Sequence, residues 1–512
     1  MKKNKNKNKD FVVWAKKFFW ALCLVVVLVI GLTILNAGFE FFWWFVLVLA
    51  GILVWFCVIY RDKIMSFVRG HKKTIRIIGL ICLVLGVILR FSFLLIQDKV
   101  DIKDVLSDTG AHWYGAQQLL DTGGFDKEIG DYESLFPFLF TYTGSLAISM
   151  RIFGSNYLAV VVLNVVFDVI GAIGVYLLFK KWKKSKDAGL FAAVVWALNP
   201  LEIVFCGLPL AIVVVNVLFI LTILSMYGIY CSLKDIKKLC FYAIMFGLVL
   251  AVGNAYRPFF VIFMIAMVIY LMLRVLKNKT LWKPGIICVL VASTMMIVGG
   301  ALIRTIHSQF NSYYDGRKSQ AGWNMYVGAN YDTQGKWNSD DRDVFFGPVL
   351  IDEAGGDVNV GQSIAMKKAI LRYGEIILRG RLISHFLNKT RVIFGDVRNA
   401  IYDIPYVFGI SKVNGLYNLL QDIIMIFYLV VFGLFFVFVL MKTKCGSKNN
   451  NNDFSLLLVI SFIGFFLAML LVESMNRYSL PFITLMLVLA MGFVVDVVKT
   501  PRGLGVGRKN VL

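Results

Sequence analysis

The sequence predicts an all-α polytopic membrane protein with about 12 transmembrane helices. Hydrophobic residues make up 59% of its 512 residues. They gather into repeated runs of about 20 residues, the length of helix that spans the hydrocarbon core of a bilayer. Many of the segments between these runs are rich in Lys and Arg, as is typical of the cytoplasmic loops of membrane proteins.

The predicted spans follow one another along the whole chain. They lie near residues 17–36, 41–60, 77–96, 157–179, 188–206, 209–231, 238–256, 258–275, 285–305, 416–441, 454–472 and 478–497. A further apolar segment, 137–153, contains several hydroxyl side chains and Arg151, so its composition alone does not show whether it crosses the membrane.

The charges of the loops predict which side each loop faces. The basic segments 2–17, 61–76, 180–184, 234–238, 274–283, 442–448 and the tail from 499 should lie in the cytoplasm. Both termini are then cytoplasmic, and the segments 97–156 and 306–415 lie outside. Only one crossing fits between 97–156 and 180–184, so we expect 137–153 to be a juxtamembrane or re-entrant helix packed against protein.

The first outer segment is acidic in a chain that is otherwise basic. Residues 98–136 contain nine carboxylates and three lysines, whereas the whole chain has 53 Lys and Arg against 31 Asp and Glu. The excess of bases is scattered among the loops, which suits anionic lipid and argues against nucleic acid as a partner. None of the eight cysteines forms a CxxC pair, so no disulfide framework or metal site is expected.

Asp108 is the candidate chemical centre of this acidic segment. The helical periodicity that starts near Asp104 puts Asp108 at a helix start, where a carboxylate can simply be a cap. Alternatively, a carboxylate near a hydroxyl can act as a general base. The sequence leaves both interpretations open.

Two arginines stand at predicted outer ends of spans, where the positive-inside rule disfavours bases. They are Arg257 in AYRPFF and Arg477 in NRYSLP. Either they anchor the helices by snorkelling to the interface, or they bind an anionic group at the level of the lipid headgroups.

Several motifs occur in a recognisable order. They include Asp108 and Tyr114 (D-x5-Y), Phe136-Pro137, FGSN (153–156), AGLFAAVVWALNP (188–200), AYRPFF (255–260), GWNMYVGANYDTQGKWN (322–338) and ESMNRYSLPFITL (473–485). This order resembles the polyprenyl-phosphate-sugar-dependent glycosyltransferases with the C-type membrane fold, the protein-mannosyltransferase-like superfamily often called family 39, in its Gram-positive form.

The resemblance implies four regions. Residues 1–76 are an N-terminal basic tail with two extra transmembrane helices, and 77–305 are the glycosyltransferase membrane core with the catalytic outer loop 97–156. Residues 306–415 form an extracytoplasmic loop region, and 416–512 hold the C-terminal transmembrane helices and a basic tail.

The resemblance also implies a mechanism. Asp108 would be the general base for the acceptor hydroxyl in a direct, inverting transfer from a polyprenyl-phosphate-linked sugar, with no metal and no cofactor. The side chains expected to bind substrate are Tyr114, His112, Glu133, Arg257, Arg477 and Tyr478. The acceptor would be a cell-wall polymer, glycolipid or protein on the outer face of a bacterial cytoplasmic membrane.

Other functions remain open. A polysaccharide polymerase or ligase also has many spans and a long outer loop, but would rely on outer Arg or His. A transporter or flippase would show internal repeats and charges along a path, whereas here polar groups concentrate at one face. The acidic residue that many relatives carry after the NP span is absent from GLPLAIVV (207–214), which leaves the acceptor side of the site open.

Three further features are less specific. Arg90 and Asp168 lie inside apolar spans, where ionisable groups are costly, but the sequence does not show whether they are partners. The triplet 341–343 imitates a D-x-D metal motif in a distant loop. A helix near 363–386 could lie on the membrane surface, with Met366, Ile370, Tyr373 and Ile377 on one face, or pack on the protein.

Overall fold

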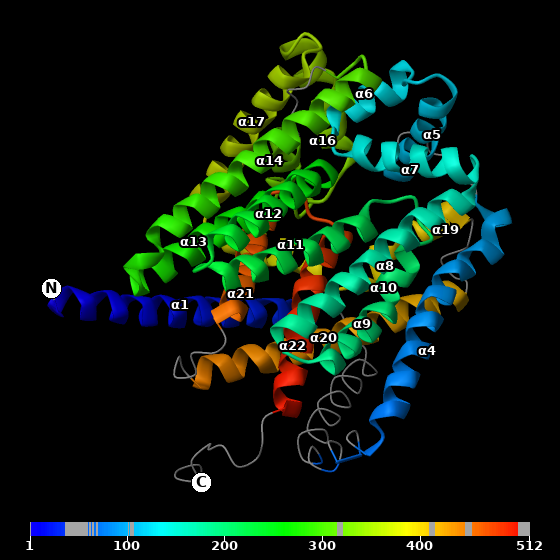
Figure 1. Ribbon diagram of the computed structural model, residues 1–512. Helices are drawn as coiled ribbons and strands as arrows, with labels where there is room; N and C mark the ends of the chain where they lie inside the picture. Colours follow the sequence, from blue (N-terminus) through cyan, green and yellow to red (C-terminus); the bar gives the residue numbers. More distant parts are fainter. Residues whose placement is uncertain are drawn as a thin grey trace.

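The computed structural model describes residues 2–35, 60, 63, 66–67, 70–100, 102, 107–314, 321–408, 415–445 and 453–499. The regular secondary structure of these residues consists of helices, and no strand occurs among them (Figure 1). The prediction of an all-α polytopic membrane protein is confirmed.

Eight helices in the described residues are long and apolar enough to cross a membrane. They are α1 (Lys2–Leu35), α4 (Lys72–Phe91, continued by the 3₁₀ helix η1, Ser92–Lys99), α8 (Tyr157–Trp182), α11 (Ile212–Ser232), α12 (Ile236–Tyr256), α14 (Trp282–Phe310, preceded by η2, Lys279–Leu281), α20 (Gly415–Cys445) and α22 (Leu480–Lys499). The predicted spans at 258–275 and 454–472 are the shorter apolar helices α13 (Val261–Lys277) and α21 (Asp453–Met469). The predicted span 41–60 lies, except for Tyr60, outside the described residues.

The predicted span 188–206 is not one helix. It is divided into α9 (Lys186–Ala197) and α10 (Pro200–Phe205). Asn199 caps α10 by accepting a hydrogen bond from the backbone N–H of Leu201, and Pro200 takes the first position of the helix. Proline has no N–H to bond to the preceding turn, so Pro200 starts a new helix and cannot continue the old one.

A buried ion pair lies beside this break. Arg90 Nε of α4 is 2.8 Å from Asp168 Oδ2 of α8, and both side chains are almost fully buried. Arg90 also donates to the carbonyl of Ala197 (2.6 Å), the last residue of α9, and Trp196 Nε1 donates to Asp168 (3.0 Å). Arg90 and Asp168 are therefore partners, and they join α4, α8 and α9. The helix break leaves the carbonyl of Ala197 in need of a donor, and Arg90 supplies it.

Replacing Arg90 with Met should destabilise the protein by about 3–5 kcal/mol, because it leaves the Asp168 carboxylate buried without its cation. The matched control is Arg76→Met, since Arg76 and Asp187 are also 2.8 Å apart but both about half exposed; that change should cost at most about 1 kcal/mol. Equilibrium unfolding in mixed micelles measures both. The double variant Arg90→Met, Asp168→Leu should recover most of the loss, and an equally unstable double variant would contradict this account.

Three helices of the first outer segment gather at one end of the bundle (Figure 1). They are α5 (Asp108–Asp121), α6 (Lys127–Leu135) and α7 (Leu139–Phe153). The helix α7 occupies the apolar segment that the sequence left ambiguous. With 15 residues it is too short to count among the candidate spans, and it packs against α5 and α8.

The second outer segment forms a helical layer of its own. Its elements are α15 (Ala321–Gly328), α16 (Ser339–Val344), the π-helical η3 (Phe345–Glu353), α17 (Val358–Leu378), α18 (Leu382–Phe394), the 3₁₀ helix η4 (Val397–Ile401) and α19 (Ile404–Phe408). The helix α17 packs on α15 and η3 through Ala365, Ala369 and Tyr373. On the same helix Ile370 and Ile377 are 59% and 56% exposed, whereas Tyr373 is buried.

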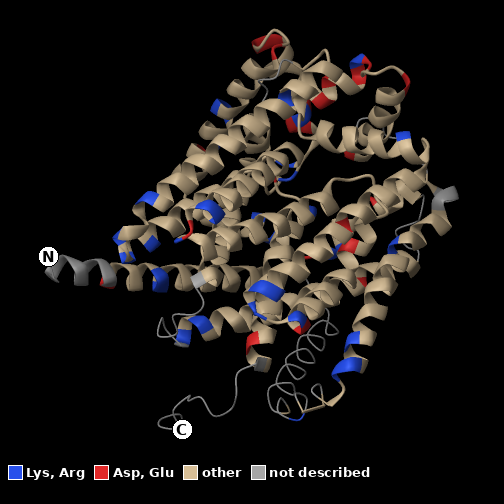
Figure 2. Cartoon of the chain, in the orientation of Figure 1, with Lys and Arg blue, Asp and Glu red and all other residues tan. Residues whose placement is uncertain are grey.

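The charges are unevenly distributed along the bundle (Figure 2). Many of the Asp and Glu lie at the end that carries α5, α6 and α17, together with several Lys and Arg, whereas Lys and Arg predominate at the opposite ends of α4, α13 and α20.

Candidate active site

Asp108 is the first residue of α5, but it is not the residue that caps this helix. Ser107 is the N-cap, and its hydroxyl accepts a hydrogen bond from the backbone N–H of Gly110 (3.1 Å). The Asp108 carboxylate therefore points elsewhere. The sequence left open whether Asp108 caps the helix, and in the structure Ser107 has that role.

Asp108 lies between two arginines that are far away in the sequence. Arg477 Nη2 donates to Asp108 Oδ2 at 2.7 Å, and Arg257 Nη2 lies 3.7 Å from the same oxygen. The three side chains are 9–15% exposed. The two arginines that the sequence singled out at the outer ends of spans thus meet at the carboxylate that it selected as the base.

Local structure holds each arginine in place. Arg477 lies in the 3₁₀ helix η7 (Asn476–Ser479), directly before α22, and Asn476 donates to the carbonyl of Asp396 (2.9 Å). Arg257 follows the last residue of α12 in an extended conformation, and its guanidinium covers the ring of Phe138 at 4.3 Å from the centroid. A guanidinium over an aromatic ring keeps its charge while burying one face.

Asp403 is a further carboxylate at this cluster that the sequence did not single out. Its Oδ2 is 3.5 Å from Arg477 Nη1, and the ring of the adjacent Tyr402 lies 5.7 Å from the Arg477 guanidinium. The hydroxyl of Tyr132 also reaches the cluster, at 3.5 Å from Asp108 Oδ1. The segment YDIPYVF (402–408) belongs to none of the motifs that carry the family resemblance, so only proximity in the fold reveals Asp403.

The electrostatics of the two carboxylates differ. Burial raises the pKa of Asp108, but the guanidinium groups of Arg477 and Arg257 outweigh burial and hold that pKa below its ordinary value. Burial raises the pKa of Asp403 to about 6, although Arg477 opposes this shift. At neutral pH both carboxylates are ionised and face two cations, so the cluster is close to neutral overall.

His112 and Glu133 lie in a buried network that joins α5, α6 and α7. Thr143 donates to Glu133 Oε1 (2.6 Å), and His112 Nδ1 is 3.0 Å from the same Thr143 hydroxyl. Burial raises the pKa of Glu133 to about 8 and lowers the pKa of His112 to about 3. Both groups are therefore neutral at pH 7, and their hydrogen bonds support the helix that carries Asp108.

The two predicted tyrosines also make intramolecular contacts. The Tyr114 hydroxyl donates to the backbone carbonyl of Ile102 (2.6 Å), which ties α5 to the chain that precedes it. The Tyr478 hydroxyl donates to Glu473 Oε2 (3.2 Å), next to Arg477 in the sequence. The geometry brings together Asp108, Arg257 and Arg477 directly, and His112 and Tyr478 lie close enough to interact with their charges. Tyr114 and Glu133 make the separate contacts described above.

The second outer segment supports the stretch of chain that carries Arg477. Lys389 is fully buried, and its ammonium donates to the carbonyls of Val472 (2.6 Å) and Gly328 (2.8 Å). The backbone N–H of Ser474 donates to Gly335 (2.7 Å). The turn before η7 is thus bonded to α18 and to the loop after α15.

No group of three or more His, Cys, Asp or Glu side chains suited to a metal ion occurs among the described residues. In the D-x-D-like triplet, Asp341 accepts hydrogen bonds from Arg372, Asn330 and Asn338. That carboxylate therefore serves the packing of the outer layer.

The arrangement offers an ionised carboxylate beside two cations at the outer helices of an apolar bundle. A carboxylate can accept a proton, and arginines can bind a phosphate through paired N–H groups. Both capacities are needed when a hydroxyl attacks a sugar attached to a phosphate.

Comparison with known proteins finds one family that part of the chain resembles. Residues 137–298, about a third of the chain, match the family model of dolichyl-phosphate-mannose-protein mannosyltransferase. The matched part runs from the start of α7 into α14 and includes Arg257. No curated protein is similar enough to the chain to be matched to it. Over this third of the chain the protein is similar to the mannosyltransferase family, and this similarity, together with the all-helical membrane bundle, supports a membrane glycosyltransferase of the C-type fold.

Proposed function

We propose that the protein transfers one sugar from a polyprenyl-phosphate-linked donor to an acceptor hydroxyl at the outer face of a bacterial cytoplasmic membrane. The observation that carries this proposal is the contact of one carboxylate, Asp108, with both Arg257 and Arg477. Such a cluster pairs a group that can take a proton with groups that can hold a phosphate. The acceptor is a cell-envelope glycan, lipid or protein.

In the proposed reaction, the acceptor oxygen attacks the anomeric carbon directly and with inversion. The new bond joins the acceptor oxygen to that carbon, and the bond from the carbon to the phosphate oxygen breaks. The acceptor proton moves to Asp108, and the leaving polyprenyl phosphate takes the electron pair. Its growing negative charge is stabilised by Arg477 and Arg257.

Donor binding would also expose the base. Both arginines contact Asp108. A donor phosphate competes for the same guanidinium groups, and the carboxylate that they release becomes free to accept a proton. Ordered binding, donor before acceptor, follows from this competition and is observable in initial-rate kinetics.

The expected sidedness can be tested with three exposed lysines replaced singly by Cys in a variant without native cysteines. Lys127 and Lys336 belong to the outer segments, and Lys186 is the first residue of α9, directly after the basic segment 180–184. A membrane-impermeant maleimide should label positions 127 and 336 in intact cells, and position 186 only after permeabilisation. Labelling of position 186 from outside would contradict both the topology and an extracytoplasmic Asp108.

Mass spectrometry of envelope glycans from cells with and without the protein is the experiment that tests the function. We expect the loss of one sugar from a single acceptor class, and the accumulation of its polyprenyl-phosphate donor. Purified protein in nanodiscs should then transfer the sugar from that donor. Loss of whole polymer chains would indicate a polymerase or ligase. Loss of the sugar with its donor trapped on the inner leaflet, and no transfer by the purified protein, would indicate a flippase.

A further inference from the structure

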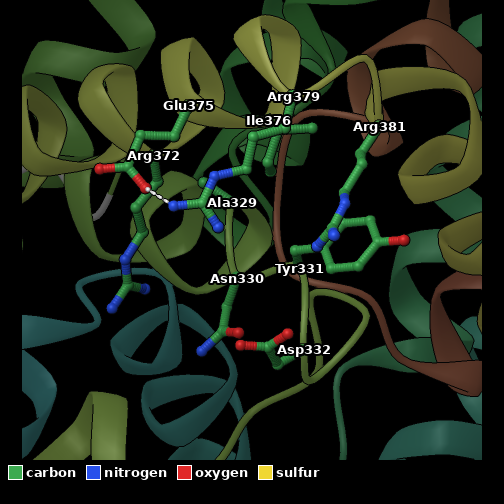
Figure 3. Close-up of a pocket in the computed structure, with 9 residues that line it drawn as sticks. All are labelled: Ala329, Asn330, Tyr331, Asp332, Arg372, Glu375, Ile376, Arg379 and Arg381. Carbon is green, nitrogen blue, oxygen red and sulfur yellow. Dashed lines mark ion pairs between the residues drawn. The ribbon is translucent and has the colours of Figure 1, made fainter.

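A pocket of about 230 Å³ opens in the second outer segment and shares no lining residue with the Asp108 cluster. One wall is the loop after α15, with Asn330, Tyr331 and Asp332, and the other is the end of α17 and the turn before α18 (Figure 3). Since a water occupies about 30 Å³ of liquid, the pocket has room for about eight waters, or for one sugar ring with a substituent.

One buried carboxylate fixes the two walls to each other. Asp341 is 2% exposed and accepts hydrogen bonds from Arg372 of α17 (2.8 Å) and from Asn330 of the loop (2.9 Å). The Tyr331 hydroxyl is 3.3 Å from Ser384 Oγ on α18. These hydrogen bonds hold the walls in place, which lowers the entropic cost of binding a ligand.

The pocket presents charges of both signs to a ligand. Arg381 lies along the Tyr331 ring, 5.3 Å from its centroid, and among the described residues its guanidinium has no carboxylate within ion-pairing distance (Figure 3). Arg379 has only a long contact with Glu375, 3.7 Å between two groups about 65% exposed, which is a weak pair. Across from them, Asp332 is an exposed acceptor.

This combination selects among ligand classes. A simple anion would be repelled by Asp332 and Glu375, and a neutral sugar would leave the Arg381 guanidinium without an anionic partner. A sugar that carries one anionic group satisfies both sides, because its anion pairs with Arg381 and Arg379 while a hydroxyl donates to Asp332. Tyr331 offers an aromatic edge beside the ring.

We propose that this pocket binds one residue of an acidic saccharide, a sugar substituted with a carboxylate or a phosphate. The anionic group lies against Arg381 and Arg379, and the sugar hydroxyls face Asp332. Nothing in the transfer chemistry at Asp108 requires this pocket, so it is a second site on the protein.

The pocket is connected to the catalytic cluster by the backbone. The loop that forms its wall continues to Gly335, whose carbonyl accepts a hydrogen bond from the N–H of Ser474, three residues before Arg477. If the proposed transferase function is correct, the acidic saccharide is part of the acceptor chain, held in a fixed position relative to Arg477. This last step rests on the proposed function, but binding itself does not.

Isothermal titration of the full-length protein in detergent tests the binding directly. The probes are glucuronic acid, glucose 6-phosphate, glucose and inorganic phosphate. We expect one or both acidic sugars to bind, and which of them binds identifies the anionic group. Glucose and inorganic phosphate should each bind at least about tenfold more weakly, because each lacks half of the contacts.

Arg381→Gln is the critical variant, and it should weaken binding of the acidic sugar by about tenfold or more. Arg391→Gln is its matched control, since Arg391 is an exposed arginine on α18 that does not line the pocket. Asp108→Asn should bind the acidic sugar normally even if transfer is lost, so a failed transfer assay and a failed binding assay are distinguishable. Equal thermal unfolding of the variants shows that they fold.

Three outcomes would overturn the proposal. The first is that no acidic sugar binds. The second is that inorganic phosphate binds as well as glucose 6-phosphate, which would make the pocket an anion site without a sugar subsite. The third is that Arg381→Gln and Arg391→Gln bind equally, which would place the ligand elsewhere.

Discussion

Replacing Asp108 with Asn should lower the rate of sugar transfer by roughly 10²–10⁴-fold, the usual contribution of a general base. Asn keeps the shape of the side chain and can still accept a hydrogen bond from Arg477, but it cannot take the acceptor proton. Single-turnover transfer from a labelled polyprenyl-phosphate sugar measures the loss. The donor should bind at least as tightly as before, because the phosphate no longer competes with a carboxylate for Arg477 and Arg257.

Two controls separate catalysis from support of the helix. Ser107→Ala removes the N-cap of α5 and should cost about 1 kcal/mol of stability with little effect on turnover. Asp121→Asn makes the same chemical change at the exposed last residue of α5 and should leave both unchanged. An Asp108→Asn protein with near-normal transfer would leave the proposed mechanism without a base.

Replacing Arg477 with Ala should weaken use of the donor by about 2 kcal/mol or more, roughly 30-fold, because a charge-assisted contact is lost from a poorly hydrated site. The removal also leaves Asp403 without its cation and Asp108 with Arg257 alone, at 3.7 Å. Donor affinity in nanodiscs and the transfer rate at saturating donor measure the two effects separately.

The chemistry of the replacement should matter as much as its charge. Lysine restores the charge but cannot reach Asp108 and Asp403 together as a planar guanidinium does, so Arg477→Lys should rescue only part of the loss. Arg257→Ala should have a smaller effect than Arg477→Ala, because Arg257 lies farther from Asp108 (3.7 Å) than Arg477 does (2.7 Å). Arg398→Ala, which breaks a part-buried pair with Asp396 in the same outer layer, is the matched control. Unchanged donor affinity in both Arg477→Ala and Arg257→Ala would remove the two arginines from the site.

The sequence by itself determined the class of the protein and three members of the central cluster, Asp108, Arg257 and Arg477. Apolar runs of bilayer length are a one-dimensional property, so composition alone locates the helices at 157–179, 209–231 and 238–256. Arg257 and Arg477 also stand out in one dimension, because bases at predicted outer ends of spans oppose the charge pattern of the other loops. Motif order then links them to Asp108.

Only the tertiary structure decided which side chains meet. Arg477 and Asp108 are 369 residues apart and bond through a charge-assisted contact that no local pattern encodes. No local pattern encodes the ion pairs Asp403–Arg477 and Arg90–Asp168 either. The partner of a buried charge depends on which groups lie near it, away from water, after the helices have packed. Helix periodicity likewise suggested that Asp108 could cap α5, whereas the exact start of the helix gave that role to Ser107. Local composition thus determines where the helices lie in the sequence and how the loops are charged. The packing of distant segments determines which side chains meet at the site.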